Sequence, residues 1–534
     1  MEGPEVSTAD GTIRGLIRRS VENFDYHAFL GIPYAKPPIG DLRFRDPEPP
    51  ERWHGIRDTT KYGNVCLQYD PMTRKFEGSE DCLYLNVYTR SIEKSKFKRP
   101  VMVWIHGGGF EFGSGSDTHF GPDYLLRKDV VLVTFNYRLY IFGFLNLEHE
   151  VAPGNQGLKD QIMVLRWIRE NIENFGGDAQ NITIFGESTG SVSAHYLTLS
   201  PLAKGLFHKV ICQSGTGLAP WARVRNSKRY AYLACNILDE YPVKPEDAHD
   251  FLKSVDALKL MKALEKLHTN MEALHQVFAF GPGVDDKSPN PVMPIPVEEA
   301  ALNGIHLPFI LGYTNREGIC YLLDYYTSTA HKSIAYEAVN WNFAKMLDLD
   351  TVEPFLNRYK IDLNHLRKMY YKNKKVCAAN SDIFADLATD VQFVEPIHRT
   401  AKIQTEKSSQ PTFLYKFCYD KDLSLMKGLL RTSMSGASHF DDVGYLFHSK
   451  QRTNLGFPNL KKGTTAYRIM EQMTELWTNF ATHGLPTSGV SKLIPVEWKP
   501  LSSGSNLDCL NIDTELKMEI LSNIENCFAS LNHK

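Results

Sequence analysis

The chain of 534 residues has no excess of charge of either sign and no long apolar run. Its 60 basic residues nearly balance its 62 acidic residues, which argues against nucleic acid or an anionic membrane surface as a partner. No apolar segment reaches about 18 residues, so the sequence predicts no membrane span. Hydrophobic residues make up 43% of the chain, which is enough for the large core of an ordinary globular protein.

Metal-binding and redox motifs are also missing. Neither C-x-x-C nor H-E-x-x-H spacing occurs, so we expect neither a metal ion nor a cofactor. The nine cysteines are scattered and odd in number, which does not indicate a disulfide framework. Only Cys66 and Cys82 are close enough in sequence to close a short loop, and two reduced thiols are favoured if the protein is cytoplasmic. A cytoplasmic location is expected because Met1 to Asp10 is acidic and polar, unless a secretion leader has been removed.

Strand-like and helix-like segments alternate, which predicts an α/β fold with a mainly parallel sheet. No repeat or long linker interrupts them, so we expect one domain over residues 1–534, with a helical insertion at about 222–305 contributing to a cap. Strands are expected at Thr12–Arg18, Cys82–Thr89, Val101–Ile105, Val130–Phe135, Ile182–Phe185, Val210–Gln213, Pro308–Tyr313 and Thr412–Tyr419. Helices are expected at Gly157–Asn174, Val192–Leu199, Ala385–Lys407, Thr464–Thr482 and Thr514–Leu531, and over most of 222–274.

Residues Gly186 to Gly190 match G-x-S-x-G, the pattern of the sharp strand-to-helix turn that exposes a nucleophilic serine. The glycines suit this turn because a side chain would collide with the neighbouring strand or helix. With glycine at about 7% of residues, chance alone produces the pattern in about one of six chains of this length. Ser188 is therefore a candidate nucleophile that needs support from other segments.

A glycine-rich loop supplies candidate donors for an oxyanion. His106 to Phe110 reads H-G-G-G-F and directly follows the strand expected at Val101–Ile105. Consecutive glycines let backbone N–H groups approach an oxyanion, and such a loop precedes the nucleophile turn in lipases and esterases. We assign the N–H groups of Gly108, Gly109 and Thr189 to this role.

An acid and a histidine are expected after the serine in this fold, beyond the carboxyl ends of strands. Glu317 follows the strand Pro308–Tyr313 and is the candidate acid, although a surface carboxylate paired with Arg316 fits the spacing equally well. Five histidines follow Glu317 as candidate bases: His331, His398, His439, His448 and His483. Only His439 lies in a glycine-bearing loop shortly after a strand, so we select it. Asp441 and Asp442 compete with Glu317 for the orienting role but rank lower, because residues two or three along in a loop seldom aim back at the same ring.

The chain resembles the type-B carboxylesterase and cholinesterase family over nearly its whole length, and within it the insect alpha-esterase type. This likeness implies an α/β-hydrolase fold, and it carries Ser188, Glu317 and His439 over as the catalytic triad. The matching segments are Phe29–Ala35, Ser79–Val87, His106–Phe110, Gly121–Tyr124, Asn155–Gln161, Phe175–Asp178, Pro220–Ala222, Asn315–Gly318 and Gly436–Asp442.

Several positions depart from the family pattern. Thr189 stands where alanine is usual, and its β-branch could narrow the oxyanion region. The loop Leu67–Asp81, which carries a cation-binding tryptophan in cholinesterases, has none here, which argues against choline esters. Of the family's disulfides, only the Cys66–Cys82 pair has a counterpart. Trp221 and Phe280 fall in segments that match the acyl pocket, with plain core packing as the alternative for each.

The resemblance implies a serine carboxylesterase that hydrolyses hydrophobic esters, including xenobiotic ones, and that organophosphates inhibit. One alternative is a hormone esterase acting on a lipid-like, juvenile-hormone-like methyl ester. Another is a slow scavenger that holds esters or organophosphates as a long-lived adduct. A non-catalytic adhesion protein of the same fold would lack the serine, so Ser188 argues against that branch.

Overall fold

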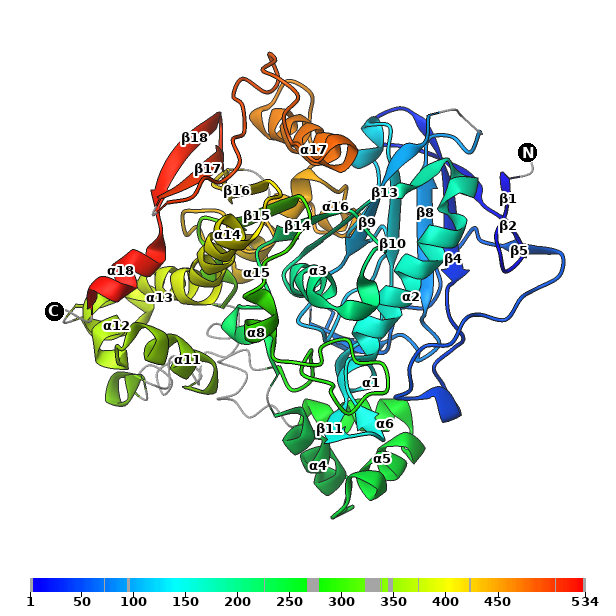
Figure 1. Cartoon of the computed structure of the whole chain (residues 1–534), viewed down its shortest axis with the longest axis horizontal. Coiled ribbons are helices and arrows are strands. Elements are labelled where there is room, and N and C mark those ends of the chain that lie inside the picture. The colour runs from blue at the N-terminus through cyan, green and yellow to red at the C-terminus, as the bar shows by residue number, and fades with distance from the viewer. Residues whose placement is uncertain are drawn as a thin grey trace.

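An 11-stranded sheet forms the centre of the computed structural model (Figure 1). The structure describes residues 3–71, 73–93, 97–224, 226–266, 278–321, 337, 339–343, 349–372, 374–421, 424–504 and 506–531. The strands in spatial order are β18 (Leu516–Ser522), β17 (Asn506–Ile512), β16 (Thr412–Phe417), β15 (Phe309–Thr314), β14 (Lys209–Gln213), β13 (Gly177–Glu187), β9 (Arg99–Ile105), β10 (Val131–Phe135), β8 (Tyr84–Thr89), β4 (Asp25–Pro33) and β3 (Leu16–Arg19). From β10 to β17 all pairs are parallel, and the pairs beyond them at both edges are antiparallel.

The central strands are apolar on both sides because helices cover both faces of the sheet. In β9, Val101 and Val103 belong to one hydrophobic core and Met102 and Trp104 to the other. The first core contains residues of α2 (Gln156–Asn171), α3 (Thr189–Leu199) and α14 (Glu395–Lys407), and the second contains residues of α17 (Thr465–His483). The expected α/β architecture with a mainly parallel sheet is confirmed.

The helix expected at Gly157–Asn174 is present and ends where its glycine predicts. Helix α2 continues into a 3₁₀ turn over Ile172–Phe175, and Gly176 then adopts a left-handed conformation with φ 79°. That conformation favours glycine, which has no Cβ to collide with the backbone. The chain then enters β13, the strand that leads to Ser188.

Two of the expected helices differ in the structure. The prediction of one helix over Thr514–Leu531 is wrong, because β18 occupies Leu516–Ser522 and only α18 (Ile524–Leu531) is helical. Pairing with β17 gives this charged segment an antiparallel partner, which its composition did not reveal. The helix expected at Ala385–Lys407 is divided into α13 (Ser381–Thr389) and α14 by a π-helical turn at Asp390–Val394.

Cys66 and Cys82 form a disulfide with a Cα–Cα distance of 4.9 Å. The reading of these residues as two reduced thiols is therefore wrong, and the pairing implied by the family resemblance is confirmed. The bridge closes the loop that contains the two-stranded hairpin of β6 (Gln68–Asp70) and β7 (Lys75–Glu77).

The segment after Ala222 is helical as expected. It contains α4 (Ser227–Ile237), α5 (Pro245–Ser254), α6 (Ala257–Glu265) and α8 (Val297–Ala301), while residues 267–277 lie outside the described part. In Figure 1, α4, α5 and α6 gather at one end of the molecule beside α1 (Tyr140–Phe144). Their assignment to a cap stays a prediction.

The remaining elements are short and peripheral. None of the helices in the described ranges combines the length and the hydropathy that a membrane crossing needs. A separate sheet contains β1 (Glu5–Ser7), β2 (Thr12–Arg14) and β5 (Ile56–Asp58), and a hairpin contains β11 (Asn146–His149) and β12 (Ala152–Pro153). Among the residues that the structure describes, the other α-helices are α11 (Leu349–Tyr359), α12 (Leu363–Tyr370), α15 (Leu425–Leu430) and α16 (Lys450–Asn454).

Candidate active site

Ser188 occupies the sharp turn between β13 and α3. Its backbone has φ 57° and ψ −127°, and its N–H donates to the Gln213 carbonyl at 2.9 Å. A Cβ on Gly190 would lie 2.0 Å from the Ile105 carbonyl oxygen, and one on Gly186 would lie 2.5 Å from the Gly190 carbonyl carbon. Both glycines are therefore required by close backbone packing, and the strained conformation leaves Ser188 partly exposed at the carboxyl end of β13.

Glu317 and His439 meet although they are far apart in sequence. The Nδ1 atom of His439 lies 2.6 Å from Oε2 of Glu317, whose other oxygen accepts the Thr314 N–H at 2.7 Å. Glu317 is fully buried. Arg316 pairs with Asp386 at 2.8 Å and not with Glu317. The alternative interpretation of Glu317 as a surface carboxylate paired with Arg316 is therefore wrong.

The two aspartates that follow His439 have other partners. Asp441 accepts the Ser438 N–H at 2.8 Å, and burial raises its pKa to about 7. Asp442 accepts the Tyr415 hydroxyl at 2.7 Å and the Gln213 amide at 2.9 Å. Of the three carboxylates considered for orienting His439, only Glu317 is hydrogen-bonded to its Nδ1 atom.

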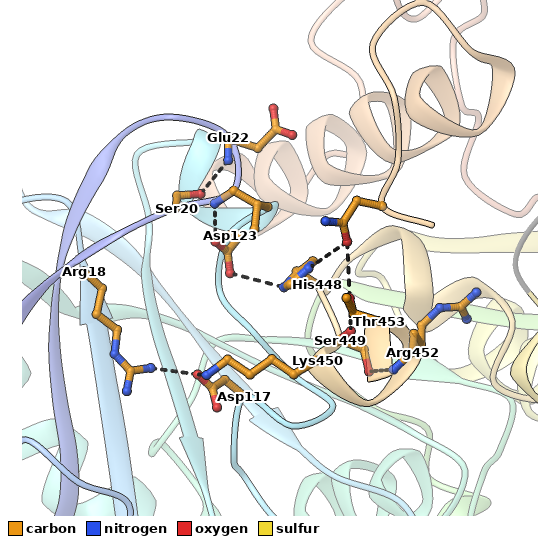
Figure 2. Close-up of polar contacts among 12 residues, drawn as sticks. Arg18, Ser20, Glu22, Asp117, Asp123, His448, Ser449, Lys450, Arg452 and Thr453 are labelled. Carbon is orange, nitrogen blue, oxygen red and sulfur yellow. Dashed lines mark hydrogen bonds and ion pairs between the residues drawn. The ribbon is translucent and has the colours of Figure 1, made fainter. Parts of the chain in front are cut away.

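Three of the other candidate histidines lie in the described part of the chain, away from the Ser188 turn in sequence and with other partners or positions. His398 is buried on α14 with its Nε2 3.1 Å from the Tyr313 hydroxyl, and burial lowers its pKa to about 3. His448 lies 3.9 Å from Asp123 in a polar network that joins the β3–β4 hairpin to α16, as Figure 2 shows. His483 is the last residue of α17, and His331 lies outside the described residues.

Glu187, the variable residue of the G-x-S-x-G pattern, was not predicted as part of the site. Its Oε1 atom lies 3.0 Å from Nε2 of His439. Burial raises the pKa of Glu187 to about 8, with further upward contributions from Asp442 and Glu317. Within the described part of the chain, the Ser188 hydroxyl makes no hydrogen bond to His439. Such bonds are often long in unliganded enzymes and shorten when substrate binds.

The carboxylates around His439 favour its charged form. Burial by itself would lower the pKa of the imidazole, but Glu187 and then Glu317 outweigh it and raise the pKa to about 9. The site therefore stabilises an imidazolium, the form that a histidine base acquires when it takes a proton.

The glycine loop lies directly against Ser188. A Cβ on Gly107 would lie 3.0 Å from the Ser188 Cβ, and one on Gly108 would lie 2.0 Å from the Phe112 carbonyl oxygen. Gly108 and Gly109 have φ of 110° and 66°, in the region that favours glycine. Within the described ranges, the N–H groups of Gly108, Gly109 and Thr189 donate to no protein acceptor. They remain available to a developing oxyanion.

Aromatic rings line another side of the site. Phe393, in the π-helical turn, has its ring centroid 5.1 Å from His439 and 5.5 Å from Trp221. Trp221 donates its indole N–H to the Gln392 carbonyl at 2.9 Å, and its ring is 6.5 Å from that of Phe278. Trp221 is thus close to the site, as the sequence predicts.

Phe280 lies elsewhere. Its side chain is fully buried, with its ring centroid 5.2 Å from Tyr140 and 6.5 Å from Tyr230. The prediction of Phe280 as a pocket residue is therefore corrected to core packing. Phe278 lies against the glycine loop, because a Cβ on Gly109 would lie 2.7 Å from its ring. The sequence alone does not indicate whether the ring of Phe278 or the ring of Phe280 faces the site.

No cluster of three or more histidine, cysteine, aspartate or glutamate side chains within the described residues could hold a metal ion. The polar groups of the site instead form a set in which a serine, a histidine and buried carboxylates are neighbours.

Comparison with known proteins agrees with this geometry. The model of the carboxylesterase family matches residues 2–528. The chain belongs to the carboxylesterase family. It is 36% identical over 507 residues to a juvenile hormone esterase of Tribolium castaneum, covering 90% of this chain and 84% of that protein. It is 32% identical to a carboxylic ester hydrolase of Bombus ignitus, covering 94% of this chain and 88% of that one.

A solved structure extends the likeness to three dimensions. The juvenile hormone esterase of Manduca sexta, with OTFP covalently attached, has a TM-score of 0.84 and 29% identity. The match covers 99% of both chains. The protein therefore has the α/β-hydrolase fold of this family. As a member of the family it is a carboxylic ester hydrolase with a serine nucleophile.

Proposed function

We propose that this carboxylesterase cleaves hydrophobic carboxylic esters through an acyl-enzyme on Ser188. The observation that carries the proposal is the close grouping of the Ser188 turn, the glycine loop and the His439–Glu317 pair, whose Nδ1–Oε2 distance is 2.6 Å. These are the four parts that acyl transfer needs: nucleophile, base, orienting acid and oxyanion donors.

The reaction proceeds in two halves. Ser188 Oγ attacks the ester carbonyl while His439 Nε2 accepts its proton, and the oxyanion is held by the N–H groups of Gly108, Gly109 and Thr189. The C–O bond to the alcohol then breaks as His439 returns the proton to the leaving oxygen. Water, deprotonated by His439, attacks the acyl group and releases the carboxylic acid and Ser188. Glu317 orients the imidazole and stabilises its charged form throughout.

The substrates are hydrophobic esters, including xenobiotic ones. Phe393 lies beside His439, Trp221 lies beside Phe393, and Phe278 lies beside Trp221. These three rings form an apolar contact surface for the acyl group. The disulfide-closed loop has no tryptophan between Leu67 and Asp81, which argues against choline esters. Organophosphates, which resemble the tetrahedral intermediate, are expected to phosphorylate Ser188.

Intact mass after treatment with an organophosphate tests this proposal, with peptide mapping of the adduct. The expected result is one phosphoryl group on Ser188 and loss of naphthyl ester hydrolysis in proportion. The S188A variant is the control and should gain no mass. An adduct on a different residue, or no adduct with full hydrolysis, would contradict the assignment.

A hormone esterase is a second candidate because two of the similar proteins are juvenile hormone esterases. That function predicts a low KM for one lipid-like methyl ester and poor turnover of generic naphthyl esters. A panel of naphthyl, choline and long-chain methyl esters discriminates between the two. A stoichiometric burst of product without turnover would instead indicate a scavenger that holds its acyl or phosphoryl group.

The expected cytoplasmic location has no support among these observations. Cys66 and Cys82 are joined in a disulfide, and structural disulfides are typical of oxidising compartments. We therefore propose that the protein acts in an oxidising environment. Free-thiol counting on protein isolated from its native tissue under alkylating conditions would test this, with seven reactive thiols expected after unfolding if the bridge is present.

A further inference from the structure

We propose that the Thr189 hydroxyl is a positioning group that clamps both ends of the glycine loop to the serine turn. This inference rests on the proposed function, since it concerns the oxyanion donors of that reaction. Thr189 directly follows Ser188 as the first residue of α3, and its side chain reaches the glycine loop.

The first contact reaches the far end of the loop. The Thr189 side chain is fully buried, and its Oγ1 atom accepts the backbone N–H of Phe110 in a long hydrogen bond of 3.4 Å. Phe110 directly follows the three glycines, and its carbonyl in turn accepts the Tyr140 N–H at 2.6 Å. Both backbone groups of Phe110 are therefore held, one of them by the serine turn itself.

The second contact reaches the near end of the loop through Tyr137. The Tyr137 phenol interacts with the Thr189 side chain and donates its own proton to the His106 carbonyl at 2.9 Å. Because that proton is committed to His106, the phenol oxygen is left to accept the Thr189 hydroxyl proton. The Tyr137 ring also stacks on His106, with centroids 4.5 Å apart.

The Thr189 hydroxyl thus reaches both ends of the loop. It accepts from Phe110 after the glycines, and it interacts with Tyr137, which donates to the His106 carbonyl before them. The glycines between these two anchors lack side chains that would restrain them, and their N–H groups have no protein acceptor within the described ranges. The clamp fixes the Gly108 and Gly109 donors relative to the Thr189 N–H, which belongs to the clamping residue.

This geometry predicts an effect on the transition state and not on substrate binding. A misplaced donor loses contact with an oxyanion that exists only during the reaction, so kcat falls while KM is retained. One neutral hydrogen bond corresponds to about a three- to tenfold change. A trifluoromethyl ketone, which forms a hemiketal oxyanion on the serine, should lose affinity by the same factor.

Four variants separate the hydroxyl from the shape of the side chain. T189V keeps the β-branch and removes the hydroxyl, and it should lower kcat and ketone affinity by about three- to tenfold at unchanged KM. T189S should restore both. Y137F should reproduce part of the loss, and its combination with T189V should be less than additive, because both changes break one network. T474V removes a buried hydroxyl of α17 that donates to the Met470 carbonyl, and it should leave kcat and ketone affinity unchanged.

Equal ketone affinity in T189V and the wild-type protein would overturn the clamp, as would a T189S variant as impaired as T189V. If T189V does not fold, as judged by its thermal midpoint, T189A and Y137F provide the same comparison. The organophosphate adduct distinguishes failure of the clamp from failure of the proposed function. An adduct on Ser188 together with an unaffected T189V leaves the proposed function standing and removes only the clamp, whereas the lack of any adduct on Ser188 in the wild-type protein removes both.

Discussion

Backbone groups form one side of the site at Ser188, and aromatic rings form another. The first side consists of Gly107–Gly109 and the first residue of α3, all within a few residues of two strand ends. The second consists of Trp221, Phe278 and Phe393, which come from three separate segments. The reaction depends on the first side in our proposal, and the choice of ester depends on the second.

The two sides differ in how much change they tolerate. A Cβ at Gly107, Gly108, Gly186 or Gly190 would lie 3.0 Å or less from a neighbouring atom. The aromatic side has ring centroids 5.1–6.5 Å apart, which are ordinary packing distances. We therefore expect substitutions on the backbone side to abolish turnover, and substitutions on the aromatic side to change which esters are preferred.

The largest expected effect comes from the residue between the two sides. S188A should lower kcat by about 10⁴- to 10⁶-fold, because the nucleophile and its base act as one unit. The measurement is hydrolysis of a naphthyl ester with purified protein, and the thermal midpoint serves as the folding control. Residual turnover above about 1% of the wild-type rate would mean that another group attacks the ester.

A smaller but still severe effect is expected from G108A. Its Cβ would lie 2.0 Å from the Phe112 carbonyl oxygen, and φ of 110° disfavours alanine, so the donor N–H must move. Loss of one oxyanion donor costs about 10²- to 10³-fold in kcat. G205A is the matched control, since Gly205 has φ of 79° but nothing within 4 Å of its Cβ. Wild-type activity in both variants would contradict the prediction, because it would show that neither the collision nor the backbone strain at Gly108 displaces the donor.

On the aromatic side, F278A and F280A should separate specificity from stability. F278A enlarges the acyl contact surface and should shift kcat/KM toward longer acyl groups by about tenfold, with a modest change in stability. F280A removes a fully buried ring and should lower the free energy of unfolding by about 3–5 kcal/mol without changing acyl preference. Chain-length series with p-nitrophenyl esters and urea unfolding measure the two quantities. A preference change in F280A would restore the original prediction for that residue.

The smallest expected effect is a displacement of the pH profile. His439 acts as a base once it loses its proton, and nearby carboxylates raise its pKa to about 9, so kcat/KM should rise with pH through a limb near pH 9. E187Q removes a negative charge 3.0 Å from Nε2, which destabilises the imidazolium, lowers its pKa and moves the limb to lower pH by about one unit. An unmoved limb in E187Q would show that Glu187 does not act on the charge of His439.

The contrast between the two sides also explains what the sequence could predict. The serine turn and the glycine loop each occupy five consecutive residues. Their tight backbone conformations require glycine at positions within those residues, so both segments can be recognised from local sequence. Glu317 and His439 became candidates because they follow strands whose carboxyl ends share one edge of the sheet, and the family resemblance then decided in favour of Glu317. Helix α2 was recognisable from its spacing and its terminal Gly176.

Features that depend on distant partners were missed or misassigned. The segment Leu516–Ser522 is a strand paired with β17, and the alternation of Leu516, Met518 and Ile520 with Lys517 and Glu519 was a strand pattern that the helix prediction overlooked. Phe278 and Phe280 differ only in which way each ring points, and that depends on Trp221 on one side and Tyr140 on the other. Glu187 was read as the variable position of a motif, although its carboxylate lies next to His439.

The π-helical turn at Asp390–Val394 makes the aromatic side of the site sensitive to the deletion of a single residue. Such a turn differs from an α-helical one by a single extra residue, and each residue of an α-helix rotates its successor by about 100°. Loss of one residue there would turn Phe393 away from Trp221 without altering the composition of either helix. Deletion of one codon that is distant from Ser188 in the sequence would then change which esters fit the site. A crystal structure of such a deletion variant would show whether the Phe393 ring moves.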